Sequence, residues 1–160
     1  MRINGVLILG LSLLISSCAH DNIDKVDTTE CPIDNIINSK DAATTLIVGK
    51  WSWARTTYKR KGVGITTETP LSAQKTLTLE FTGEKVRIIE NSTLTEEQYE
   101  IKFWGEDTNI ADGILAVKFF KMTGELHGTS MLLLNTSGTC LTLVNSYNDA
   151  GGDLNFKRVD

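Results

Sequence analysis

The sequence lacks two features that define large classes of proteins. It has no excess of positive charge, because 16 Lys and Arg stand against 20 Asp and Glu, a net charge of −4 at pH 7. Nucleic-acid-binding domains normally carry a basic stripe, so we expect no nucleic-acid partner. It also has no long hydrophobic run: the apolar stretch at residues 6–15 falls short of the about 20 residues that a membrane-spanning helix needs.

Residues with the spacing of a catalytic or metal site are equally scarce. The chain has two histidines, His20 and His127, and neither is spaced to form a metal pair or a Cys–His dyad. No Gly-x-Ser-x-Gly motif occurs, and no Gly-rich phosphate-binding loop follows a predicted strand. The acidic pairs at residues 96–97 and 106–107 stand in polar segments, and we interpret them as solvated turn residues. We therefore expect no enzymatic activity, no cofactor and no bound metal.

The N-terminus has the pattern of a secretory signal. A charged Arg2 precedes the apolar stretch, and small residues follow it in Ile15-Ser16-Ser17-Cys18. This run resembles the lipobox of bacterial lipoproteins, in which a diacylglyceryl group is attached to the cysteine and the chain is cut before it. The resemblance implies a signal peptide at residues 1–17 and acylation of Cys18, with palmitate-like chains as the membrane anchor. Ala19 follows Cys18 instead of Asp, which favours the outer membrane of a Gram-negative envelope, and its periplasmic or surface face stays open.

Three cysteines are present in the whole chain. If Cys18 carries lipid, Cys31 and Cys140 remain as an even pair in an oxidising compartment. We predict a disulfide bond between them, and two unpaired thiols are the alternative.

The remaining chain divides into a tether and one domain. Residues 18–38 are acidic, with few large apolar side chains, which predicts a flexible tether. Asn38 and Asp41 are typical of a helix start and Gly49 of a helix end, so a short helix is expected to open the domain at residues 39–160.

After Gly49 the hydrophobic period changes from helical to two, which indicates strands. Eight strands are predicted at residues 51–58, 75–81, 85–90, 98–104, 114–121, 129–134, 139–147 and 154–159, with a weaker one at 63–67. Short turns join them and no long helix intervenes, so we predict an all-β fold, an antiparallel up-and-down eight-stranded barrel with a short N-terminal helix. A sandwich remains the alternative, because alternation does not distinguish the two.

The run Leu46-Ile47-Val48-Gly49-Lys50-Trp51 resembles the Gly-X-Trp entry of lipocalins and lipocalin-like bacterial lipoproteins. The resemblance covers about residues 45–160. It implies that a short helix leads into the first strand and that Trp51 packs across the closed end of the barrel. It also implies that Arg158, on the last strand, stacks over Trp51.

Lipocalins bind small apolar molecules at the barrel mouth, so the resemblance implies such a ligand here. Trp53 and Tyr99 lie towards strand ends and are the candidate mouth aromatics. The predicted inward side chains are large, which favours a largely filled barrel, whereas a mouth cavity above about 300 Å³ would favour ligand binding.

Trp104 gives the alternative function. Alternation places it opposite Phe103, on the outer face, and exposed Trp residues are enriched at binding hot spots. A filled barrel with this surface would be a protein-interaction module, an inhibitor or a subunit of an envelope complex. An enzyme acting on envelope carbohydrate is the third hypothesis.

Overall fold

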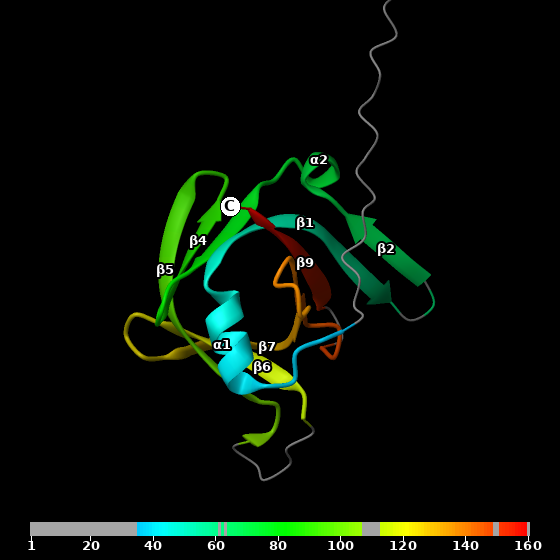
Figure 1. Ribbon diagram of the computed structural model, residues 1–160. Helices are drawn as coiled ribbons and strands as arrows, with labels where there is room; N and C mark the ends of the chain where they lie inside the picture. The colour runs from blue at the N-terminus through cyan, green and yellow to red at the C-terminus, as the bar shows by residue number, and fades with distance from the viewer. Residues whose placement is uncertain (1–34, 61, 63, 107–112, 149–150, 160) are drawn as a thin grey trace, which may run out of the picture.

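Nine strands follow one another along the chain and form one antiparallel sheet that closes into a barrel (Figure 1). The computed structural model describes residues 35–60, 62, 64–106, 113–148 and 151–159. The strands are β1 (Gly49–Arg60), β2 (Gly64–Glu68), β3 (Leu77–Phe81), β4 (Lys85–Glu90), β5 (Thr93–Phe103), β6 (Leu115–Lys121), β7 (Leu126–Leu134), β8 (Cys140–Val144) and β9 (Gly152–Val159). Two helices accompany them in the described ranges, α1 (Lys40–Ile47) and α2 (Pro70–Ala73).

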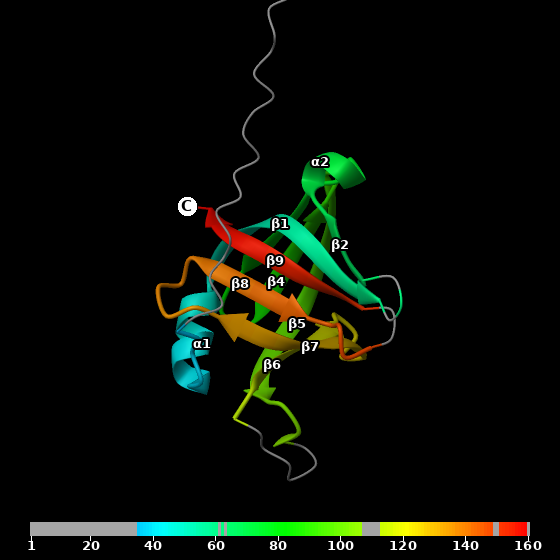
Figure 2. The ribbon, with the colours of Figure 1, turned by 90° about the vertical axis from the view of Figure 1, so that its right-hand side faces the viewer.

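The barrel is closed by the pairing of its first and last strands. β1 pairs antiparallel with β9, from Lys50 opposite Val159 to Tyr58 opposite Gly152. The first half of β1 also pairs with β3, and the sheet continues in chain order to β9. β2 pairs only with the second half of β1, so it lies outside the eight-stranded ring (Figure 2). The predicted all-β, up-and-down eight-stranded barrel with a short N-terminal helix is confirmed, and the sandwich alternative is wrong.

β1 carries a bulge. Its register on β9 shifts between Trp53 and Arg55, so one extra residue stands in β1. Trp51 and Trp53 are buried, and beyond the bulge the buried residue is Thr56, not Arg55. A bulge shifts the side-chain alternation by one residue. The simple alternation predicted for the whole strand is therefore broken after Trp53.

α1 covers one end of the barrel, which we call the closed end (Figures 1 and 2). At its start, the Ser39 hydroxyl accepts a hydrogen bond from Ala42 N. Ala43 and Ile47 on its inner side are fully buried. Eight residues are too few for an isolated helix to be stable in water, so its burial against the barrel supplies the stability.

The described chain joins the barrel at this same end. Ile36 forms an antiparallel bridge with Asn135, the residue that follows β7. Ile37 N donates to Leu134 O and Thr136 N donates to Asn35 O, both at 2.9 Å. The predicted signal peptide, most of the predicted tether, Cys18 and Cys31 lie outside the described residues.

The β4–β5 hairpin is tighter than its sequence suggested. Asn91 and Ser92 form a two-residue turn with φ of 46° and 71°, between paired Glu90 and Thr93. Two successive positive φ values are the signature of a type I′ turn, whose twist matches that of the flanking strands. β5 therefore begins at Thr93, earlier than the predicted start at residue 98, and residues 96–97 belong to a strand.

A single apolar core fills the barrel. Its buried members come from α1 and all eight strands of the ring: Ala43, Ile47, Trp51, Trp53, Leu79, Phe81, Val86, Ile101, Leu115, Val117, Leu132, Leu134, Leu141, Leu143 and Phe156, joined by Ile37. Among the described residues, no helix is long and apolar enough to cross a membrane.

Candidate functional site

The closed end is organised around Arg158. Its guanidinium carbon lies 4.5 Å from the ring centroid of Trp51, and the two residues are register partners on β9 and β1. Trp51 is fully buried and donates from Nε1 to Ile47 O at 2.8 Å. This is the contact that the lipocalin resemblance implied for these two side chains.

Arg158 also donates hydrogen bonds to three backbone carbonyls near the C-terminal end of α1. Its Nε donates to Gly138 O at 2.6 Å and its Nη1 to Val48 O at 3.0 Å, while Nη2 donates to Leu46 O. A cation at a helix C-terminus satisfies carbonyls that have no partner within the helix. The side chain therefore connects α1, the β7–β8 turn and the first strand.

Gly49 is the residue that permits this arrangement. Its φ is +136°, a conformation that other residues rarely adopt, and a Cβ built on it would lie 2.3 Å from Arg158 Nη1. The Gly-X-Trp sequence thus combines a glycine that leaves room for the guanidinium with a tryptophan on which it stacks.

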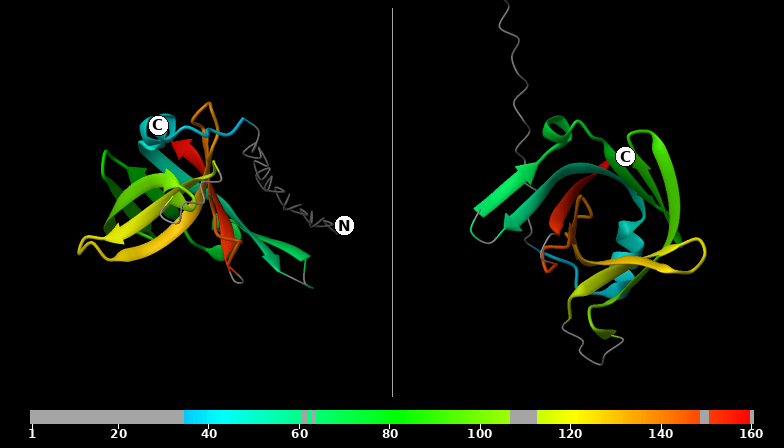
Figure 3. Two further views of the ribbon diagram at one scale, coloured as in Figure 1. Left: turned by 90° about the horizontal axis from the view of Figure 1, so that it is seen from below. Right: turned by 180° about the vertical axis from the view of Figure 1, so that it is seen from behind.

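Figure 3 (right) shows the ribbon from the end opposite α1. This end holds a cavity of about 340 Å³, which we call the mouth cavity. Its apolar wall comes from five strands of the ring: Leu77, Leu79, Ile88, Phe119, Leu143, Leu154 and Phe156, with Gly128 at its side. Four polar side chains share the lining: Lys75, Glu90, Glu97 and His127. The largely filled barrel favoured by the sequence is thus filled towards α1 and open at the mouth.

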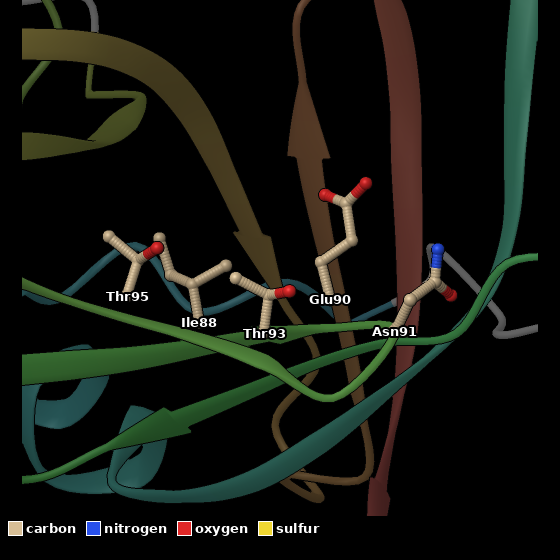
Figure 4. Close-up of a pocket in the computed structure, with 5 residues that line it drawn as sticks. All are labelled: Ile88, Glu90, Asn91, Thr93 and Thr95. Carbon is tan, nitrogen blue, oxygen red and sulfur yellow. The ribbon is translucent and has the colours of Figure 1, made fainter.

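A hollow of about 300 Å³ on the β4–β5 hairpin adjoins the mouth cavity. It shares Ile88 and Glu90 with the mouth cavity and adds Asn91, Thr93 and Thr95. Figure 4 shows Ile88, Glu90, Thr93 and Thr95 on one side of the hairpin, with Asn91 at its turn. The rim of the mouth is therefore polar while its interior is apolar.

Glu97 is the unusual residue of the mouth cavity. The residue is only 4% exposed, in line with the inward-facing Ile101 further along β5. Glu97 Oε1 lies 2.5 Å from Nδ1 of His127 on β7. The other carboxylate oxygen, Oε2, is buried and has no hydrogen-bond partner among the described residues. Most buried polar atoms in proteins have a partner, so an orphaned carboxylate oxygen needs an explanation.

Of residues 96–97, which we interpreted as solvated turn residues, only Glu96 is solvated, and both lie in β5 and not in a turn. Glu96 is exposed, and a hydrogen bond and charge from Lys85 at 2.8 Å lower the pKa of its carboxyl. The predicted strand at residues 98–104 does not include Glu97, because β5 begins earlier, at Thr93. The signal was available, since Glu97 extends the alternation of Tyr99, Ile101 and Phe103 by one step.

Another hollow, of about 360 Å³, lies on the outer surface over β1, β7, β8 and β9. It contains the other buried carboxylate of this region, Asp153. Asp153 Oδ1 accepts from Asn145 N at 3.1 Å and Ser146 N at 2.9 Å, and Oδ2 lies 3.8 Å from Lys59 Nζ. Both of its oxygens have partners, in contrast to those of Glu97.

Trp53 and Tyr99, the expected mouth aromatics, do not line the mouth cavity. Trp53 is 5% exposed and donates from Nε1 to Thr56 Oγ1 at 3.0 Å, so it belongs to the core. Tyr99 donates its hydroxyl to Thr82 O at the β3–β4 turn and packs edge-on against Phe81. Burial raises the pKa of the Tyr99 hydroxyl. Neither side chain is therefore among the lining of the mouth cavity.

Trp104 lies just beyond the end of β5 and is half-buried. Its ring packs edge-on against Tyr147, with the centroids 4.8 Å apart. Tyr147, from the segment after β8, also donates its hydroxyl to Thr129 O. The expected outer aromatic surface is thus a pair of rings that partly cover each other.

The structure is thus a closed antiparallel barrel with a cavity at the end opposite α1. No family model, no curated protein and no solved structure matches the chain. In the part of the chain that the structure describes, no group of three or more His, Cys, Asp or Glu residues is placed to hold a metal ion.

Proposed function

We propose that the domain binds a small, mainly apolar ligand in the mouth cavity. The observation that carries the proposal is the cavity of about 340 Å³ at the end opposite α1. Ligand-binding pockets start at about 300 Å³ and are mostly apolar with a few placed polar groups. The apolar wall and the four polar side chains of the mouth cavity fit this description.

Octan-1-ol is a suitable first probe. The cavity volume equals about eleven water volumes of about 30 Å³, which suits a ligand of about ten non-hydrogen atoms. By calorimetric titration of the purified protein without detergent, we expect a dissociation constant on the order of 100 µM or tighter. Absence of binding by octan-1-ol and by its amine and carboxylate analogues would count against the ligand-binding function.

Filling the cavity should abolish binding. Ile88 is half-buried and lines both hollows of the mouth, so Ile88→Trp is expected to weaken octan-1-ol binding at least tenfold. Ile65 on β2 is 70% exposed and lies outside the ring, so Ile65→Trp is the matched control and should keep wild-type affinity. Equal affinities for both variants would place the ligand elsewhere.

The alternative function, a protein-interaction module, rests on Trp104 and Tyr147. This aromatic pair lies on the outside of a barrel whose mouth is open, and the two rings already contact each other. The open cavity favours ligand binding over the interaction module.

We further propose that the protein is a lipoprotein of the outer membrane, anchored through acylated Cys18. The signal-like residues 1–17 and the lipobox-like Ile15-Ser16-Ser17-Cys18 support this. Cys18→Ala is expected to move the protein to the soluble fraction or to leave its signal peptide uncleaved. Fractionation with intact-mass measurement tests this, and a processed variant that stays in the membrane would overturn the anchor.

A disulfide between Cys31 and Cys140 is part of the same proposal. Asn35, four residues after Cys31, is hydrogen-bonded to Thr136, and Cys140 N donates to Asn135 Oδ1 at 3.0 Å. The Asn135 turn therefore brings the chain that follows Cys31 close to the start of β8. A bond here would fasten the N-terminal segment to the closed end.

A further inference from the structure

We infer that Glu97 selects the ligand: the mouth cavity takes amphiphiles that carry a hydrogen-bond donor, with a protonated amine preferred and a carboxylate disfavoured. This inference rests on the proposed ligand-binding function and specifies its chemistry. It starts from the buried Oε2 of Glu97, which has no partner in the described ranges although the residue lines the cavity.

The burial of this oxygen makes an unsatisfied state costly. A buried carboxylate oxygen loses its hydration, and without a donor that loss is not compensated. His127 contacts only Oε1. A donor on the ligand would supply the missing hydrogen bond to Oε2, whereas a purely apolar ligand would leave this oxygen without a partner.

The other cations near Glu97 are already engaged. Lys75 lines the mouth cavity, and its Nζ lies 2.9 Å from Glu90 Oε1. Lys121 is the register partner of Glu97 on β6, and its Nζ lies 2.8 Å from Glu125 Oε2. Neither lysine is therefore an available counter-charge for a bound carboxylate, and a carboxylate ligand would meet Glu97 as a like charge. A protonated amine would instead be attracted to the Glu97 carboxylate and could donate a hydrogen bond to it.

A purely structural role for Glu97 explains the burial less well. A structural ion pair with His127 would leave both carboxylate oxygens bonded or hydrated, as at Asp153, where two backbone amides and Lys59 surround the carboxylate. At Glu97 the histidine is 58% exposed in its side chain and serves one oxygen only. The free oxygen belongs to a residue that lines the cavity.

Three probes with the same eight-carbon chain test the inference: octylamine, octan-1-ol and octanoate, titrated calorimetrically into the detergent-free protein at neutral pH. Hydrogen bonds to charged groups are strong enough that we expect octylamine to bind about tenfold to hundredfold more tightly than octanoate, with octan-1-ol in between. This comparison uses only the wild-type protein, so its result does not depend on whether a variant folds.

Glu97→Gln keeps the shape of the side chain and removes its charge. In this variant the preference of octylamine over octanoate is expected to fall to within about threefold. Glu96→Gln is the matched control, because Glu96 is the adjacent residue, faces outward and pairs with Lys85. That variant should retain the wild-type preference.

The outcomes separate the inference from the function on which it rests. If all three probes bind equally and Glu97→Gln changes nothing, the cavity binds ligands and a water molecule satisfies Oε2, so the inference is overturned alone. If octanoate binds best, the inference is also overturned. If none of the probes binds, the proposed ligand-binding function itself fails.

Discussion

Replacing Arg158 with alanine is expected to lower the free energy of unfolding by about 4 kcal/mol. The guanidinium donates to the carbonyls of Leu46, Val48 and Gly138 and stacks on Trp51, and all these interactions are lost together. Carbonyls left without a donor add to the cost. Urea unfolding followed by tryptophan fluorescence measures the change, and the melting temperature should fall by about 10 °C.

Arg60→Ala is the matched control for this result. Arg60 also lies over an aromatic ring, 5.5 Å from the centroid of Tyr58, but it is exposed at the end of β1. An exposed cation–π contact contributes little, so we expect a loss of at most about 1 kcal/mol. Equal losses for the two arginines would show that the closed end does not depend on Arg158.

Gly49→Ala is expected to destabilise the barrel by about 3 kcal/mol. Two effects add: an alanine at a φ of +136° is strained, and its Cβ would displace Arg158 Nη1, only 2.3 Å away. Gly83→Ala is the control, because a Cβ there meets nothing within 4 Å. We expect that variant to change the free energy of unfolding by at most about 0.5 kcal/mol.

The double variant Gly49→Ala, Arg158→Ala separates the two effects. In the absence of the guanidinium the new methyl group has no clash with it, so only the strain of the backbone remains. The two losses should therefore sum to more than the loss in the double variant, a coupling of about 1 kcal/mol or more. Strict additivity would contradict the role assigned to Gly49.

The fold could be predicted because its signals are local. Strict alternation in most strands, turn residues between them and a helix-start pattern before Gly49 each indicate one element, and short connections favour neighbouring antiparallel pairs. Closure could not be derived from alternation, since it depends on the pairing of β1 with β9, which are about a hundred residues apart in sequence.

Three details could not be predicted because no local pattern in the sequence indicates them. The bulge after Trp53 adds one residue to β1 without any glycine or proline to mark it, and it decides that Thr56 is buried instead of Arg55. α2, with its Thr69 capping box and Pro70, was not anticipated because four residues carry no periodicity. The mouth also depends on packing: the sequence shows that inward side chains are large, but not that they leave space at one end.

Glu97 illustrates the limit most clearly. A glutamate next to another glutamate in a polar segment is usually solvated, and this held for Glu96. Which of the two faces inward depends on where β5 starts, and that in turn depends on the two-residue turn at Asn91 and Ser92. A shift of one residue in the strand would have exchanged their environments.

The bridge between Ile36 and Asn135 determines at which end of the barrel the N-terminal segment is attached. Because the chain joins the barrel at the end covered by α1, a lipid on Cys18 would hold the domain by its base. The opening, at the other end, would then stay clear of the point where the tether is attached.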